Sequence, residues 1–117
     1  MAIAGIKGRG RRQQVSAALK IPRAVLQSLR ILRAFRPDLV LISAGFDAHE
    51  ADPIGGMKLS DDGFAQMTDR VVAIAERHAR GRIVSFLEGG YDLEALPRCV
   101  QVHLERLAVA GNDKRNE

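Results

Sequence analysis

Two residues of this sequence stand where side-chain chemistry is expected. Asp47 follows the apolar run 39–42 after a short turn, and Tyr91, the only tyrosine, follows a second apolar run at 83–87. A carboxylate in such a place can ligate a metal, act as a general base, or cap a loop. A phenol that is neutral at pH 7 can donate a hydrogen bond to a developing oxyanion. The spacing therefore indicates a polar site built from one carboxylate and one phenol.

Each candidate also has a structural interpretation. Asp47 can bond to backbone N–H groups of its own loop, as aspartates commonly do. The pair Gly89 and Gly90 lets the backbone approach a ligand closely, but it equally fits a tight turn with Tyr91 packed as an amphipathic aromatic. Asp47 and His49 form an Asp-x-His pair of zinc-compatible ligand types, although catalytic zinc usually takes three protein ligands. We interpret His49 as a loop or surface histidine.

The other polar or reactive residues are interpreted as structural. His78 lies on the apolar face of a predicted helix, and His103 lies in the last predicted helix. Cys99 is interpreted as a small core hydrophobe. The glycines at 5, 8 and 10 do not make a phosphate loop, because no strand precedes them and no Lys-Ser/Thr follows.

The elements that must position the two candidates form a βαβ unit. Residues 39–43 predict the first strand, and its first four residues are apolar without alternation, which is typical of a parallel strand buried on both faces. Residues 82–87 predict a second strand, and the helix between them begins after Ser60 as its N-cap. The crossover should be right-handed. Because parallel strands end at the same edge of a sheet, both candidates are expected on one rim.

Flanking helices complete the predicted α/β fold. An amphipathic stripe at 25–35 follows Pro22 and ends before Pro37, and a second stripe at 96–107 follows Asp92 as a possible cap. Two strands leave both sheet edges unpaired and much of each face bare, which is a marginal fold. The chain is therefore interpreted as a piece of a larger doubly wound domain.

Composition fits one globular domain or part of one. The 117 residues are 46% hydrophobic, with a single cysteine and so no internal disulfide. This is compatible with a reducing cytoplasm, which is the predicted location. No run approaches the roughly 20 apolar residues of a membrane span, and the N-terminus does not read as a signal peptide.

The net charge of +4 is concentrated at the N-terminus. Residues 1–14 contain four cations and no acid, whereas the remaining basic and acidic residues balance. We divide the chain into a basic flexible tail at 1–14, a body at 15–110 and a polar tail at 111–117. The basic tail is interpreted as a solvated end, so nucleic acid is not an expected partner. A nucleic-acid-binding arm would instead show a steep salt dependence that is lost on deleting residues 1–14.

Three stretches resemble the histone deacetylase superfamily, in its order and spacing: Arg-Pro-Asp-Leu-Val-Leu-Ile-Ser-Ala-Gly-Phe-Asp-Ala-His at 36–49, Asp-Pro-Ile-Gly-Gly at 52–56, and Leu-Glu-Gly-Gly-Tyr-Asp-Leu at 87–93. The bacterial branch of acetoin-utilisation proteins and acetylpolyamine amidohydrolases looks nearest. The likeness runs from about Leu29 to Leu107. It implies the C-terminal part of an arginase-like fold and zinc-dependent hydrolysis of an acetyl amide, with an acetylated amine or acetyl-lysine as substrate.

The resemblance also implies roles for five residues. Asp47 falls on one of the family's three zinc ligands, so Zn²⁺ is the expected cofactor. Tyr91 falls on the tyrosine that polarises the substrate carbonyl and stabilises the oxyanion. Ile54 falls on the loop that lines the acyl-lysine channel, and Gly89 and Gly90 fall close to the substrate.

The chain also departs from the family pattern. The family's other two zinc ligands, an Asp-x-His pair, and its His-His general base lie well upstream of the Gly-Phe-Asp motif. Here no His-His occurs and no histidine precedes Asp47. His49 does not replace the missing pair, because Asp47 already occupies the third-ligand position. We expect a chain that is inactive alone, with its site completed by a complementing polypeptide or by sequence outside this chain. The alternative is a non-catalytic interaction module or gene remnant that forms homo-oligomers or binds a partner.

Overall fold

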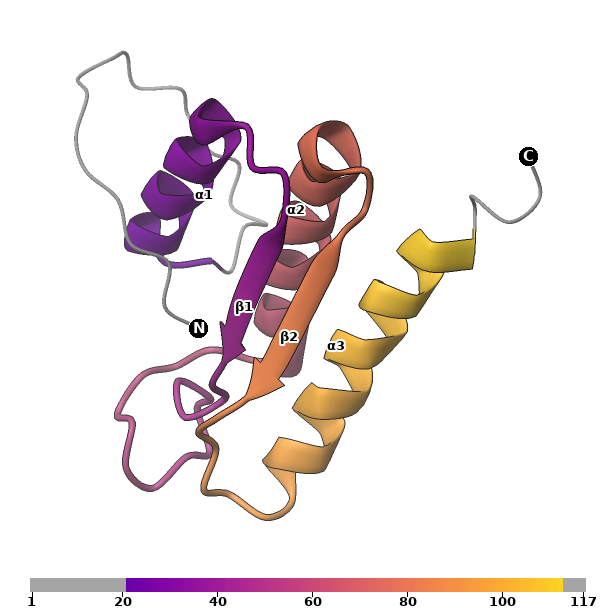
Figure 1. The fold of residues 1–117 in the computed structure, drawn as a ribbon. Helices are drawn as coiled ribbons and strands as arrows, with labels where there is room; N and C mark the ends of the chain where they lie inside the picture. Colours follow the sequence, from indigo (N-terminus) through magenta and orange to yellow (C-terminus); the bar gives the residue numbers. More distant parts are fainter. Residues whose placement is uncertain (1–20, 113–117) are drawn as a thin grey trace.

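The computed structural model describes residues 21–112, and these form a two-stranded parallel sheet with three helices. The elements follow in the order α1 (Arg23–Phe35), β1 (Val40–Ala44), α2 (Asp61–Ala79), β2 (Ile83–Leu87) and α3 (Ala95–Asn112). Figure 1 shows α2 behind the sheet, α1 on the side of β1 and α3 on the side of β2. The predicted tail at 1–14 lies outside the described residues, and α3 continues two residues into the predicted polar tail at 111–117.

The predicted βαβ unit is confirmed. β1 and β2 pair in parallel from Val40 opposite Ile83 to Ala44 opposite Leu87, within one residue of the predicted bounds. The chain crosses from β1 to β2 behind the sheet in the right-handed sense (Figure 1). Ser60 caps α2, since its Oγ accepts a hydrogen bond from the Gly63 N–H at 3.3 Å.

The core lies between the back of the sheet and α2. The β1 residues that face α2 are buried, and so are the apolar residues of the facing helix surface: Val40, Ile42, Ala44, Phe64, Met67, Val71 and Ala75. Phe46, just beyond β1, packs its ring against Phe64 with centroids 5.1 Å apart. This packing fixes where the chain leaves β1.

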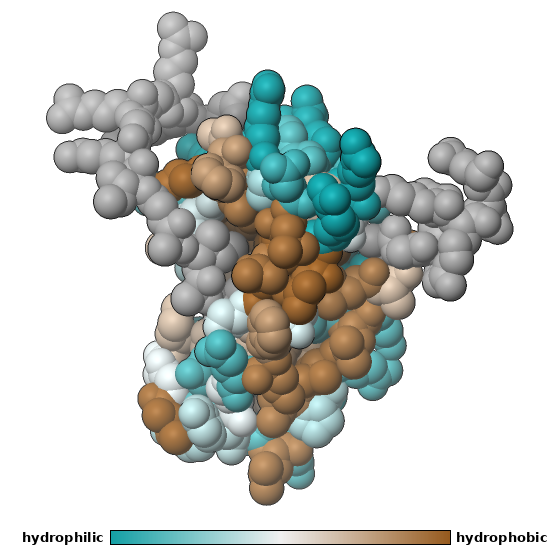
Figure 2. Space-filling view, in the orientation of Figure 1, coloured by the Kyte–Doolittle hydropathy of each residue, from teal (hydrophilic) through white to brown (hydrophobic). Residues whose placement is uncertain are grey.

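The front of the sheet is bare, so the prediction that the first strand is buried on both faces is wrong for this chain. Four apolar side chains are 49%, 64%, 42% and 55% exposed, in the order Leu39, Leu41, Val84 and Phe86. We call these four residues the front face. Figure 2 shows a band of apolar side chains running over the two strands. Within residues 21–112 no element covers this face. For this reason burial alternates along β1, although its residues are mostly apolar.

The flanking helices begin and end close to the predicted positions. α1 starts after Pro22 and stops at Phe35, two residues before Pro37. The carboxylate of Asp92 accepts hydrogen bonds from two N–H groups at the start of α3, at 3.1 Å and 2.6 Å, which confirms the predicted cap. None of the helices in the described part of the chain is both long and apolar enough to cross a membrane.

Candidate functional site

The loops that follow β1 and β2 are joined at the carboxyl edge of the sheet. Beyond the last strand pair, the Glu88 N–H donates to the Ala44 carbonyl at 3.1 Å and the Phe46 N–H donates to the Gly89 carbonyl at 2.7 Å. Asp47 and Tyr91 follow these contacts by one and two residues. Their backbones therefore share one rim, as the parallel pairing predicts.

Asp47 fits this rim because two glycines surround it. A Cβ on Gly89 would stand 3.0 Å from the Asp47 Oδ2, so the missing side chain leaves room for the carboxylate. A Cβ on Gly55 would stand only 1.6 Å from the Asp47 carbonyl oxygen. The chain at 52–55 thus folds back onto the Asp47 backbone, which the sequence had shown only as a turn-rich loop.

Tyr91 follows a turn that requires glycine. Gly90 has φ +139°, and a Cβ there would meet the Leu96 Cδ1 at 2.6 Å. The Tyr91 side chain is 54% exposed, which does not fit the alternative of a packed aromatic. Its backbone N–H donates to the Asp52 Oδ2 at 2.8 Å. The phenol is therefore accessible, while its backbone is held.

Asp52 is a buried carboxylate whose structural role the sequence did not reveal. Its Oδ1 accepts hydrogen bonds from the N–H groups of Ile54 at 2.8 Å and Gly55 at 2.9 Å. Burial raises the pKa of the Asp52 carboxyl, but the N–H groups of Tyr91, Ile54 and Gly55 outweigh it and hold the pKa below its ordinary value. The Ile54 side chain is 70% exposed.

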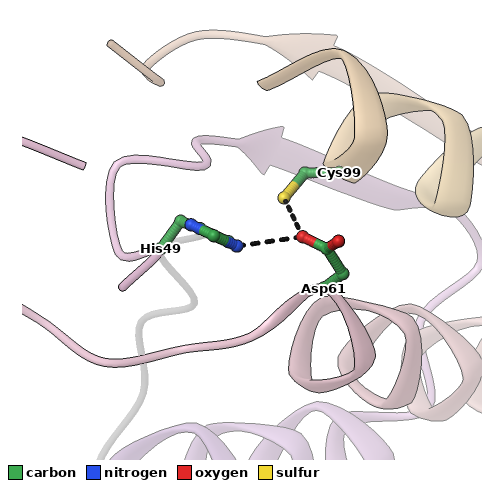
Figure 3. A group of neighbouring side chains, drawn as sticks. All are labelled: His49, Asp61 and Cys99. Atoms are coloured by element: carbon green, nitrogen blue, oxygen red, sulfur yellow. Dashed lines mark hydrogen bonds and ion pairs between the residues drawn. The ribbon is translucent and has the colours of Figure 1, made fainter. Parts of the chain in front are cut away.

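A second polar cluster joins His49, Asp61 and Cys99 (Figure 3). The His49 Nε2 lies 2.9 Å from the Asp61 Oδ1, and the Cys99 thiol donates to the same oxygen at 3.4 Å. His49 is only 4% exposed, so its interpretation as a surface histidine is wrong. The loop after β1 returns to the start of α2, where Asp61 stands, and this contact buries the ring. Cys99 is buried as predicted.

The hydrogen bonds of this cluster connect the loop after β1, the start of α2 and α3, and we call the cluster the brace. The ligand atoms of His49, Asp61 and Cys99 lie within 4.8 Å of one another, the one such group among residues 21–112. The Ala51 N–H donates to the His49 Nδ1 at 3.0 Å, so the ring proton sits on Nε2 and is donated to Asp61. Burial and the Asp61 carboxylate raise the pKa of the Cys99 thiol to about 12. Both nitrogens of the ring are thus engaged, and the sulfur keeps its proton.

Asp61 itself is held in its charged form. Burial raises the pKa of its carboxyl, but hydrogen bonds from Arg98, Cys99 and His49 outweigh burial and leave the pKa below its usual range. The Arg98 Nε donates to the second oxygen at 3.1 Å. The cluster ties the loop after β1, the start of α2 and α3 together, and it does not include Asp47.

His103 is structural, as predicted. His103 is 4% exposed and bridges two hydroxyls, with Nδ1 2.8 Å from the Thr68 Oγ1 and Nε2 2.9 Å from the Ser85 Oγ. Burial lowers the pKa of His103. His78 is half-buried on α2, and its buried Nε2 has no hydrogen-bond partner within the described chain.

Comparison with known proteins identifies the fold. The Histone deacetylase domain profile matches residues 12–107, which is most of the chain. The chain belongs to the histone deacetylase family. This deacetylase-family chain is 43% identical over 79 residues to Type-2 histone deacetylase 2 of Dictyostelium discoideum, and 44% identical over 80 residues to the Histone deacetylase-like amidohydrolase of Pseudomonas aeruginosa. It superposes on the crystal structure of the HDA15 HD domain with a TM-score of 0.61 at 35% identity.

These matches cover about two thirds of the deacetylase-family chain and a small part of each relative. They span 65% of this chain and 5% of the Dictyostelium protein, and 68% of this chain and 21% of the Pseudomonas protein. The match to the HDA15 domain spans 68% of this chain and 21% of that one. Since solved deacetylase domains have the arginase/deacetylase fold, the β1–α2–β2 unit is part of that fold.

The family is generally zinc-dependent, which raises the question of whether the rim fits zinc. Asp47 is a half-buried carboxylate whose Oδ2 lies beside Gly89, and a carboxylate oxygen suits zinc. Among residues 21–112, Asp47 belongs to no group of three or more His, Cys, Asp or Glu side chains whose ligand atoms lie close enough together to hold a metal ion. The described residues therefore fit one position of a catalytic zinc site and do not make a complete one.

Proposed function

We propose that this chain is part of a zinc-dependent deacetylase that hydrolyses the acetyl amide of an acetyl-lysine or an acetylated polyamine. The observation that carries the proposal is the joined rim, where the Asp47 carboxylate lies against Gly89, two residues before Tyr91. In this proposal Asp47 is a zinc ligand, and Tyr91 is the residue that acts on the substrate carbonyl.

The chemistry assigned to this chain is hydrogen-bond donation. The Tyr91 hydroxyl donates a hydrogen bond to the acetyl oxygen, and this hydrogen bond strengthens as negative charge develops there. A phenol is neutral at pH 7, so it stabilises the oxyanion without giving up its own proton. In this proposal Gly89 and Gly90 lie close to the acetyl group, and Ile54 lines the entrance. Zinc, when bound, would supply Lewis acidity and an activated water.

The charge of the rim supports a cationic substrate. The loops at 45–60 and 88–94 carry six carboxylates and one lysine: Asp47, Glu50, Asp52, Lys58, Glu88, Asp92 and Glu94. A cleft lined by one sign of charge attracts ligands of the other sign. Acetylated polyamines and acetyl-lysine in basic peptides both carry positive charge beside the acetyl group, so we expect KM to rise with ionic strength.

Complementation tests the proposal. The chain would be mixed with the Pseudomonas relative truncated before its matching segment, and zinc content and hydrolysis of acetyl-lysine and acetylpolyamine substrates would be measured. We expect zinc uptake and turnover in the mixture, and no turnover by the chain alone above a Tyr91→Phe control. Asp47→Ala should remove zinc, whereas Tyr91→Phe should keep zinc and lower kcat. Robust turnover by the isolated chain, or a mixture insensitive to both substitutions, would refute the proposal.

The bare front face favours a second candidate function, that of a non-catalytic interaction module. Parallel sheets are normally covered on both faces, so exposed Leu41 and Phe86 favour self-association or binding to a partner. Sedimentation of the metal-free chain tests this function. Phe86→Lys should shift dimers toward monomers, while Leu93→Lys, which changes an 85% exposed side chain outside the sheet, should not. Stable metal-free dimers that never acquire activity would favour the module.

A further inference from the structure

Asp52 connects two parts of the rim that are far apart in sequence. It is 8% exposed, and no Lys, Arg or His of the described chain lies within ion-pair distance of it. Its two oxygens are satisfied by backbone N–H groups on either side of the rim. A buried carboxylate without a cationic partner is costly unless it is fully hydrogen-bonded, so these contacts need an explanation.

The two oxygens have different tasks. Oδ1 accepts from Ile54 at 2.8 Å and Gly55 at 2.9 Å, which is an ordinary turn made by an aspartate with the residues that follow it. That turn uses only one oxygen. Oδ2 accepts from the N–H of Tyr91, 39 residues away, at 2.8 Å. A residue needed only to form the turn at 52–55 would have no use for this second contact.

The turn at 52–55 packs against the backbone of Asp47. A Cβ at Gly55 would overlap the Asp47 carbonyl oxygen, so the turn lies directly on that backbone group. The Asp52 carboxylate therefore links the backbone of Tyr91 to the turn that packs on the Asp47 backbone. Loss of the carboxylate would leave the Tyr91 loop joined to the β1 loop through the Phe46–Gly89 hydrogen bond.

We propose that Asp52 is a positioning residue, which fixes the loop of Tyr91 relative to Asp47 and the Ile54 turn. The catalytic meaning of this role rests on the proposed function, because it matters for turnover only if Tyr91 acts on the substrate. The positioning itself does not depend on zinc or on activity, so it can be tested in the chain alone.

The single tyrosine gives a direct readout. A chain labelled with [¹⁵N]tyrosine has one labelled backbone amide, that of Tyr91. In the unmodified chain this amide lies outside helix and strand, yet we expect its hydrogen exchange to be slowed by about tenfold or more, because it is bonded to a buried carboxylate. Exchange at the rate of an unprotected amide would overturn the proposal before any variant is made.

Asp52→Ser separates the two tasks. A serine hydroxyl can still accept from the N–H groups of the turn, but it is too short to replace the Oδ2 contact with Tyr91. We expect Asp52→Ser to keep the circular dichroism spectrum and to lose the protection of the Tyr91 amide. Asp38→Asn, which removes an exposed carboxylate that makes no hydrogen bond in the described chain, should leave that amide unchanged. An unchanged Tyr91 amide in Asp52→Ser would refute the proposal.

A functional readout distinguishes this proposal from the proposed function. In the complemented mixture, Asp52→Ser should lower kcat about tenfold or more with little change in KM or zinc content, and it should add no further loss to Tyr91→Phe. Additive losses would overturn positioning through Tyr91. If the mixture has no activity at all, the proposed function fails, while the amide experiment still decides the role of Asp52.

Discussion

Two adjacent glycines in the loop after β1 should lose different amounts of stability on substitution by alanine, for different physical reasons. At Gly55 a Cβ would stand 1.6 Å from the Asp47 carbonyl oxygen, whereas at Gly56 a Cβ would meet nothing within 4 Å. Gly56 instead has φ +61°, a conformation that L-residues rarely adopt. Gly55→Ala therefore tests a steric contact with the backbone, and Gly56→Ala tests backbone conformation alone.

The magnitudes follow from these two situations. Ordinary contact begins at 3.4 Å, so the Gly55 loop must move by about 1.8 Å from Asp47, and no side-chain rotation can relieve the overlap because the contact is with backbone. Forced backbone shifts of this kind cost about 3 kcal/mol or more. A left-handed alanine at Gly56 costs about 1 kcal/mol, partly offset by the smaller entropy of the unfolded chain. We therefore expect the free energy of unfolding to fall by about 2 kcal/mol more in Gly55→Ala than in Gly56→Ala.

Urea unfolding followed by circular dichroism measures this difference. For a domain of this size, a loss of 2 kcal/mol corresponds to a Tm about 8–16 °C lower. The Tyr91 amide should also shift in Gly55→Ala, because the turn that carries Asp52 moves. Equal stability of the two variants, or a larger loss in Gly56→Ala, would show that the loop does not lie on the Asp47 carbonyl.

Three further substitutions or treatments test the packing around the rim. Phe64→Ala removes a fully buried ring that packs on Phe46 and should cost about 3–5 kcal/mol in urea unfolding; a loss below about 1 kcal/mol would contradict this core. Cys99, buried and with its pKa raised to about 12, should not react with a thiol reagent at pH 8 until urea unfolds the chain, and reaction in the folded state would contradict the brace. Burial lowers the pKa of His103, so the unfolded chain takes up a proton below pH about 6.5 that the native chain does not, and stability should fall from pH 7.5 to 5.5. His103→Gln should reduce that fall, and an unchanged pH dependence would show that the ring is not held neutral.

The sequence was sufficient for the elements and for the shared rim. Ser60 before an amphipathic stripe predicts the start of α2, and Asp92 predicts the start of α3, because both signals act within one turn of the chain. The apolar run at 39–42 predicts β1 but not its exposure. Leu41 is 64% exposed because no element within residues 21–112 covers it, and a local pattern carries no information about such long-range cover.

Local pattern also could not assign the polar residues to their partners. Three polar residues within six positions of one another have unrelated partners. Asp47 lies beside Gly89, Asp52 accepts from the Tyr91 N–H, and His49 is buried against Asp61. His49 was interpreted as a loop or surface histidine, and it does lie in the loop after β1 but is buried. Its burial comes from the return of the loop to α2, a long-range contact that has no signature in sequence spacing. The overlap at Gly55 gives no signal beyond the presence of a glycine.

The rim and the front face differ in how far the contacts of this chain determine their structure. The rim is held by its own contacts, from Gly55 on Asp47, from Asp52 on Tyr91 and from Phe46 on Gly89. The front face is not covered by any element within residues 21–112 and leaves apolar side chains exposed, which lowers stability and favours association. A partner that covers the front face should therefore raise the unfolding temperature without moving the Tyr91 amide. If covering that face shifts the amide instead, the geometry of the rim depends on the partner, and the isolated chain does not carry half of the site in its working form.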